Sequence, residues 1–286
     1  MTFVSCKLIG GLGNQLFQIF ATMSIAITTN QAFIFPYSEM LTTGIPRQTY
    51  WKTLLDRLIN YTTFQTAESD NSYIFSLPHV GERGFEYDEL VGIRVNLEKG
   101  SLCLHGYFQS YKYFEKQYET ITNIIGLREK QESILEKTKI IVKNTVSIHF
   151  RLGDYVSKQN YHPVMSVKYY MNALTRIIDE LGIDTFRVVY FGEKDDEPTI
   201  NISIQVLAKK FPYLEFVKAD LEEDWEQMLL MSVCSHNIIA NSSFSWWGAY
   251  FNKNPDKIVC YPAVWFGPAI INHSTKDLCP SSWTRI

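Results

Sequence analysis

Short apolar runs alternate with helical stretches throughout the second half of the chain. Val146, Ile148 and Phe150 alternate with polar residues, as in a β-strand. Four further β-rich runs follow, and amphipathic segments with apolar residues at every third or fourth position lie between them. This alternation predicts a parallel, doubly wound α/β sheet with right-handed crossovers. The predicted strands are residues 146–150, 186–191, 214–217, 237–240 and 258–261, and the predicted helices are residues 167–181, 203–211, 220–232 and 241–251.

The first half of the chain shows a weaker form of the same pattern. A strand over residues 3–9 runs through a glycine turn into a helix over residues 16–27. We therefore predict two Rossmann-like domains facing a cleft, residues 1–140 and residues 141–286. The other predicted elements of the first half are strands over residues 32–35, 73–77 and 101–105, helices over residues 50–58 and 127–141, and a loop over residues 81–92.

Composition and charge narrow the classes of function. The chain has 286 residues and a net charge of −3, which argues against broad binding of nucleic acid or of anionic membranes. Any anion site must therefore be local. The five cysteines are scattered and form no CxxC pair, so we expect reduced thiols in a cytoplasmic protein.

The sequence shows no recognisable targeting signal and no membrane-spanning segment. The N-terminus lacks the basic and apolar regions of a signal peptide, and no stretch approaches the roughly 20 apolar residues of a membrane helix. We expect no membrane span, although a lipid-linked acceptor would bring the protein to a membrane surface. The oligomeric state is not predicted.

Polar residues gather where three of the predicted strands of the second half end. Carboxyl ends of parallel strands share one edge of a sheet, where ligands collect in open α/β folds. An arginine there, together with hydroxyls at a helix start, suits an anionic phosphate. A surface ion pair and an ordinary helix cap remain the alternatives. The residues are His149, Arg151 and Asp154, then Glu193, Asp195 and Asp196, then Asn241, Ser242 and Ser243.

Two stretches of the first half are further candidates. The glycine turn over residues 10–15 lets a backbone come close to a ligand, but taken alone the pattern favours a tight structural turn. The aromatic stretch over residues 106–114 fits either a sugar-binding surface or a core. The sequence has no Asp-x-Asp, no phosphate-binding lysine loop and no His/Cys ligand spacing, so no metal site is predicted.

Four segments together resemble one enzyme family. His149-Phe-Arg-Leu-Gly-Asp-Tyr155 resembles the HxRRGDY motif of the α-1,2-fucosyltransferases, glycosyltransferase family 11. The segments over residues 10–18, 106–110 and 241–248 are similar to three other signatures of that family. The resemblance implies a GT-B fold and transfer of fucose, with inversion, from GDP-β-L-fucose to the 2-hydroxyl of a galactose. It also implies that neither a metal nor another cofactor takes part.

The resemblance also assigns roles to residues. His149 would contact the guanosine, and Arg151 would bind the β-phosphate and stabilise the departing GDP. Asp154 is the candidate base for the acceptor hydroxyl, and a structural brace for the turn is an equal alternative. The remaining donor-site residues are Asp195, Asp196, Asn241, Ser242, Ser243 and Phe244, and the residues expected on the acceptor side are Gly11, Asn14, Gln15, Tyr107 and Gln109.

The chain departs from the family pattern, and two rival functions stay open. Leu152 stands where the motif has its second arginine, so Arg151 alone would carry any role shared by the two. Gln227 stands where an acidic residue is expected on the helix before the serine motif. The rivals are a fucosyltransferase of another linkage, such as α-1,6 or protein O-fucosyl, and a non-catalytic nucleotide- or glycan-binding module.

Overall fold

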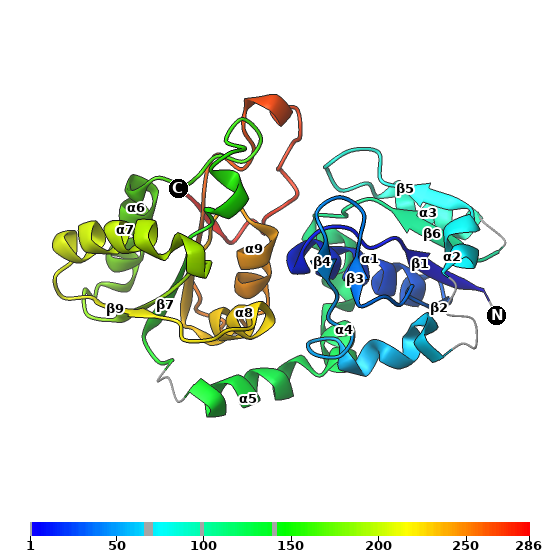
Figure 1. Cartoon of the computed structure of the whole chain (residues 1–286), viewed down its shortest axis with the longest axis horizontal. Coiled ribbons are helices and arrows are strands. Elements are labelled where there is room, and N and C mark those ends of the chain that lie inside the picture. Colours follow the sequence, from blue (N-terminus) through cyan, green and yellow to red (C-terminus); the bar gives the residue numbers. More distant parts are fainter. Residues whose placement is uncertain (1, 66–70, 98–99, 139–141) are drawn as a thin grey trace. The chain divides into compact units, whose positions relative to one another are not determined.

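The computed structural model describes residues 2–65, 71–97, 100–138 and 142–286, which divide into two compact units (Figure 1). Unit 1 comprises residues 1–130 and 273–280, and unit 2 comprises residues 131–272 and 281–286. The boundary therefore follows Lys130, ten residues before the predicted one. One C-terminal segment also belongs to unit 1, because Asp277 binds there: its carboxylate accepts from the Lys112 ammonium at 2.5 Å and its carbonyl from the Ser110 hydroxyl at 2.6 Å.

Unit 1 is built on a four-stranded parallel sheet with the strand order β2-β1-β6-β5. The apolar side chains of α1 are buried, and Phe114 packs against two of them, Phe17 and Phe20. The strands are β1 (Phe3–Cys6), β2 (Ala32–Phe33), β3 (Met40–Leu41), β4 (Arg47–Gln48), β5 (His79–Gly81) and β6 (Leu102–His105). The α-helices are α1 (Leu12–Thr28), α2 (Ser72–Ser76), α3 (Leu90–Leu97) and α4 (Tyr118–Ile125), and α5 (Leu127–Thr138) continues into unit 2.

Unit 2 is built on a six-stranded parallel sheet with the order β12-β11-β10-β7-β8-β9. Helices α6 and α7 pack on one face and α8 and α9 on the other, as in a doubly wound sheet (Figure 1). The strands are β7 (Thr145–His149), β8 (Arg187–Phe191), β9 (Glu215–Lys218), β10 (His236–Ile238), β11 (Val259–Tyr261) and β12 (Thr284–Arg285). The helices are α6 (Val167–Leu181), α7 (Glu197–Lys210), α8 (Asp224–Val233) and α9 (Ser243–Tyr250).

The five strands predicted for the second half are confirmed as β7 to β11, and the short β12 is an addition. Their apolar side chains form one core with those of α6 and α7, which includes Val146, Ile148 and Leu174. Within the ranges that the structure describes, no helix combines the length and apolar character needed to cross a membrane.

Five local predictions are wrong. Two helices begin earlier than predicted: α1 begins at Leu12, four residues before residue 16, and α7 begins at Glu197, six residues before residue 203. Residues 73–77 lie mostly in the short helix α2 instead of a strand, and only Ile74 of that helix is buried. The predicted helix 50–58 is a series of turns leading into a 3-10 helix, Asp56–Tyr61. The predicted helix start at residue 220 lies four residues too early, because α8 begins at Asp224.

The predicted helix over residues 127–141 is confirmed to Thr138, and its last three residues lie outside the described ranges. In the aromatic stretch, Phe108, Tyr113 and Phe114 are buried in the core of unit 1, whereas Tyr107 is 41% exposed. The core interpretation therefore holds for Phe108, Tyr113 and Phe114, whereas Tyr107 is exposed and Tyr111 is only partly buried.

Candidate active site

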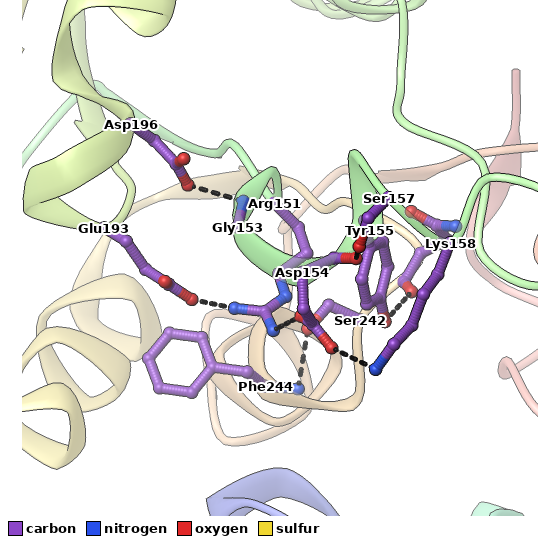
Figure 2. A network of polar contacts seen from close by, with 11 residues as sticks. Arg151, Gly153, Asp154, Tyr155, Ser157, Lys158, Glu193, Asp196, Ser242 and Phe244 are labelled. Atoms are coloured by element: carbon purple, nitrogen blue, oxygen red, sulfur yellow. Dashed lines mark hydrogen bonds and ion pairs between the residues drawn. The ribbon is translucent and has the colours of Figure 1, made fainter. Parts of the chain in front are cut away.

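Arg151 lies two residues beyond the carboxyl end of β7, and two carboxylates hold its side chain. Its Nη1 forms an ion pair with Glu193 Oε1, and its Nη2 lies 2.5 Å from Asp154 Oδ1 (Figure 2). The side chain is 19% exposed. Burial lowers the pKa of the guanidinium, but Glu193, Tyr155 and Asp154 outweigh burial and raise the pKa above its usual value. Arg151 is therefore a fixed positive charge at this edge of the sheet.

Tyr155 connects Arg151 to the segment that begins α9. The guanidinium carbon of Arg151 lies 5.0 Å from the centre of the Tyr155 ring, and the Tyr155 hydroxyl donates to the Asn241 carbonyl at 3.3 Å. The strand register agrees with this proximity, since Ile148 of β7 pairs with Ile238 of β10, and Arg151 and Asn241 each follow three residues later. The structure thus brings together two of the strand ends that the sequence singled out.

The start of α9 presents Ser242 and Ser243. Ser242 caps the helix, and its hydroxyl oxygen accepts from the Phe244 backbone N–H at 3.3 Å. The Asn241 side chain is buried and donates to the carbonyls of Pro163 and Trp265 at 3.0 and 3.1 Å. Asn241 therefore holds two loops in place around the site. The first N–H groups of an α-helix favour a bound anion, and here they lie on the same sheet edge as Arg151.

His149, the last residue of β7, is 7% exposed and lies against Phe244, with 5.3 Å between the ring centres. Burial, assisted by the nearby charge of Arg151, lowers its pKa to about 3. The ring is therefore neutral at pH 7. Its Nδ1 is buried and has no hydrogen-bond partner among the described residues. A neutral imidazole can accept a hydrogen bond at one nitrogen and donate one from the other, as recognition of a nucleobase requires.

The acidic residues after β8 have three different surroundings. Glu193 pairs directly with Arg151, although it was noted in the sequence only for its strand-end position. Asp196 accepts from the Gly153 backbone N–H at 2.8 Å and so fixes the turn after Arg151, where Gly153 has a φ of +42°. Asp195 is exposed on a short 3-10 helix. The expected donor contacts of Asp195 and Asp196 stay predictions, and the contact with Gly153 makes Asp196 a supporting residue.

The glycine turn of unit 1 is arranged around buried amides. Gly10 has a φ of +82°, and a Cβ there would lie 2.5 Å from Asn14 Nδ2, so only glycine fits. Gly11 precedes α1 as its N-cap residue with an ordinary backbone conformation. Gln15 was expected to face a ligand, but it is buried, and its amide donates to the carbonyls of Gly10 and Gln48 at 3.0 and 2.8 Å. Gln15 therefore stabilises the turn from inside.

Asn14 and Gln109 form a pair at the carboxyl edge of the unit 1 sheet. Gln109 Nε2 donates to Asn14 Oδ1 at 2.7 Å, and both side chains are only partly buried. Next to this pair, the Glu82 carboxylate accepts from the backbone N–H groups of Tyr107 and Phe108 at 2.7 and 2.9 Å. Burial raises the pKa of Glu82 to about 7. The sequence offered no signal for Glu82, which lies in a stretch predicted only as a loop.

No described group of three or more His, Cys, Asp or Glu side chains is arranged as a metal site. The metal independence implied by the motifs stays a prediction. The cysteines at positions 6, 103, 234, 260 and 279 are free thiols, as expected from their scattered spacing.

The sequence matches the profile of Glycosyl transferase family 11 over residues 85–266. It is 28% identical over 318 aligned positions to an alpha-1,2-colitosyltransferase of Escherichia coli, an alignment that covers 100% of this chain and 99% of the relative. It is 24% identical over 295 positions to a galactoside 2-alpha-L-fucosyltransferase of Caenorhabditis elegans, covering 96% of this chain and 77% of that protein.

Among solved structures, the chain is similar to the ADP-heptose lps heptosyltransferase II of E. coli, with a TM-score of 0.51 and 10% identity, covering 100% of this chain and 90% of that one. At this identity the likeness concerns the fold alone. It agrees with the two parallel sheets in confirming the expected GT-B fold of two Rossmann-like domains. Because the profile match extends over more than half of its residues and includes Arg151 and the α9 segment, this chain belongs to glycosyltransferase family 11.

Proposed function

We propose that this glycosyltransferase moves L-fucose from GDP-β-L-fucose to the 2-hydroxyl of a galactose, with inversion and without a metal. One observation carries the proposal. Arg151 is linked through Tyr155 to the start of α9, so a guanidinium and a helix N-terminus lie on one edge of the unit 2 sheet. That combination can hold the diphosphate of a sugar nucleotide.

The reaction is an in-line displacement at the anomeric carbon of fucose. The bond from this carbon to the β-phosphate oxygen breaks while a bond to the acceptor 2-oxygen forms, and the acceptor hydroxyl loses its proton. Negative charge grows on the departing GDP. Arg151, Ser242 and the first N–H groups of α9 would stabilise that charge, and loss of one such donor typically lowers the rate by roughly 10²–10³-fold.

The contacts of Asp154 suit a structural role in the turn after Arg151 better than the role of general base for the acceptor hydroxyl. Its Oδ1 pairs with Arg151 and its Oδ2 lies 3.3 Å from the Lys158 ammonium. Both oxygens of this carboxylate already form ion pairs, which suits a structural brace. We therefore assign Asp154 to the turn after Arg151, where its carboxylate pairs with the guanidinium while no donor is bound. The acceptor proton is released to solvent water, so the products are the fucosylated galactoside, GDP and one proton.

A colitosyl donor is the second candidate, because the relative that aligns over the whole chain is named a colitosyltransferase. Colitose is L-fucose without its 3-hydroxyl, so the two donors differ in one polar group. Fucose remains the first choice because the four motifs resemble those of the α-1,2-fucosyltransferases and because the animal relative is named a fucosyltransferase.

To test the proposal, the purified protein is incubated with GDP-fucose or GDP-colitose and with β-1,3- or β-1,4-linked galactosides, in the presence and absence of EDTA. We expect GDP release in the presence of EDTA and, by NMR, an α-1,2-linked fucosyl product. A different linkage in the product would favour another fucosyltransferase class, and preferential use of the colitosyl donor would favour the second candidate. GDP binding without any transfer would favour a non-catalytic module.

A further inference from the structure

We propose that Lys158 is a second cation of the donor-phosphate site, and that the Asp154 carboxylate lies between Lys158 and Arg151 until a diphosphate replaces it. The inference rests on the proposed function, since it takes a nucleoside diphosphate as the ligand. It assigns a ligand-binding role to a residue outside the family motif.

The geometry around Asp154 is the first reason. Each oxygen of this carboxylate carries a cation: Arg151 Nη2 at 2.5 Å from Oδ1 and Lys158 Nζ at 3.3 Å from Oδ2. Figure 2 shows the Lys158 side chain reaching back to Asp154, on the other side of that carboxylate from Arg151. Two cations on neighbouring oxygens suit the oxygens of a phosphate as well as those of a carboxylate.

The local balance of charge is the second reason. Arg151 pairs with both Glu193 and Asp154, so its single positive charge is already matched by two negative ones. A diphosphate brings further negative charge and needs another cation close by. Lys158 is a cation that shares a carboxylate with Arg151 among the described ion pairs. Its side chain is 45% exposed, and so loose an ion pair costs little to open.

Leu152 supplies the third reason. It stands at the motif position where an arginine was expected, and it is 9% exposed within the core of unit 2. No side chain at this position can supply charge at the sheet edge without leaving that core. The second positive charge that the family motif implies would therefore come from elsewhere in the chain.

Backbone hydrogen bonds hold Lys158 at the right place. Its N–H donates to the Tyr155 carbonyl at 3.0 Å, and its carbonyl accepts from the N–H groups of Tyr161 and His162 at 2.8 and 2.9 Å. The segment over residues 156–161 lines a cavity of about 250 Å³. Lys158 thus has a backbone fixed by hydrogen bonds and borders this cavity.

The experiment measures binding of inorganic pyrophosphate and of GDP by calorimetry, and the steady-state constants for donor and acceptor. Lys158→Ala should raise the Kd for pyrophosphate and the KM for the donor roughly tenfold, because a hydrogen bond to a charged group is lost. The salt dependence of binding should weaken, and Lys158→Arg should restore most of the affinity. The acceptor KM should not change.

Two further variants sharpen the result. Asp154→Asn removes the competing carboxylate and should lower the Kd for pyrophosphate. Lys210→Ala, at the exposed end of α7, is the matched control and should leave every constant unchanged. Thermal unfolding checks that each variant is folded.

A folded Lys158→Ala protein with a Kd for pyrophosphate within twofold of wild type overturns the inference, and so does an equal loss in Lys210→Ala. Weaker pyrophosphate binding in Asp154→Asn rejects the exchange of carboxylate for phosphate. If pyrophosphate binding depends on Lys158 but no sugar is transferred, the anion site stands and the proposed function fails.

Discussion

The carboxyl edges of the two parallel sheets share a backbone plan and differ in charge. Each has a glycine with positive φ near the end of a strand, Gly10 in unit 1 and Gly153 in unit 2. In unit 2 the turn carries Arg151 among carboxylates from two strand ends. In unit 1 the side chains that follow the turn are uncharged amides, Asn14 paired with Gln109, and the nearby carboxylate is Glu82, whose pKa burial raises to about 7.

This difference shows that the strand-turn-helix plan makes room for a ligand but leaves its chemical class to the side chains. A guanidinium with helix N–H groups suits a diphosphate. An amide pair suits the hydroxyls of a neutral sugar, and the exposed ring of Tyr107, two residues before Gln109, suits its apolar face. We therefore expect unit 2 to govern the donor and unit 1 the acceptor.

The largest effect is expected when the charge of the unit 2 edge is removed. Arg151→Ala should lower turnover by roughly 10²–10³-fold, because the departing diphosphate loses its fixed cation. The assay is initial-rate GDP release with saturating acceptor. Arg176→Ala is the matched control, since this exposed arginine of α6 pairs with Glu180 one helical turn away. Near-normal turnover of folded Arg151→Ala would refute the assignment of the donor site.

The next effect concerns stability and unit 1. Gln15→Leu should lower the free energy of unfolding by about 1–3 kcal/mol, because the carbonyls of Gly10 and Gln48 lose their buried donor. Denaturant titration measures it, with Gln205→Leu on the exposed face of α7 as the control. If Gln15→Leu changed the donor KM while stability stayed constant, Gln15 would belong to a ligand site after all.

The dependence of stability on pH should have opposite signs at the two edges. His149 has its pKa lowered from 6.5 to about 3, so the unfolded chain binds the extra proton between these values and stability falls as the pH drops through them. Glu82 has its pKa raised from 4.5 to about 7, so the folded chain binds the extra proton and stability falls as the pH rises through that window.

Each group should contribute a slope of up to about 1.4 kcal/mol per pH unit, and the two slopes oppose each other where the windows overlap. Denaturant titrations of His149→Gln and Glu82→Gln between pH 3 and 8 separate them. The stability difference between wild type and His149→Gln should grow with pH up to 6.5. A difference that does not vary with pH would mean that the imidazole is not held neutral.

The smallest effect is expected at the amide pair. Asn14→Ala should raise the acceptor KM roughly 2- to 10-fold, because the loss of one neutral hydrogen bond weakens binding by about that factor. The donor KM should not change. Asn123→Ala, at an exposed position of α4, is the control. A shift in the donor KM instead would break the division between the two edges.

Local pattern predicted most of unit 2 because its strands are apolar runs bounded by turn residues. The same pattern placed Arg151 and Ser242 at strand ends, and parallel pairing of β7 with β10 then brings those ends together. The strand prediction at residues 73–77 was wrong because a short run of aromatic and branched residues fits either a strand or one helical turn. Acidic residues at several successive positions likewise gave more than one plausible start for α8.

The partners of Arg151 could not be predicted in the same way. Glu193 lies 42 residues away in sequence, and its ion pair depends on β7 and β8 being neighbours in the sheet. Tyr155 contacts Arg151 through its ring face, and Glu82 binds backbone N–H groups. Neither kind of contact produces a recognisable spacing of residues in the sequence. Burial of Gln15 follows from the turn that it holds, so an amide at a glycine turn is as consistent with an internal brace as with a ligand contact.

The return of residues 273–280 to unit 1 bears on how the protein can be dissected. The chain passes from one unit to the other after residues 130, 272 and 280, so neither unit is a continuous stretch of sequence. A fragment ending at residue 130 would lack Asp277 and leave the Lys112 ammonium and the Ser110 hydroxyl without their acceptors. Separate production of unit 1 therefore requires residues 273–280 as well, either joined to residue 130 by a linker or co-expressed as a second piece.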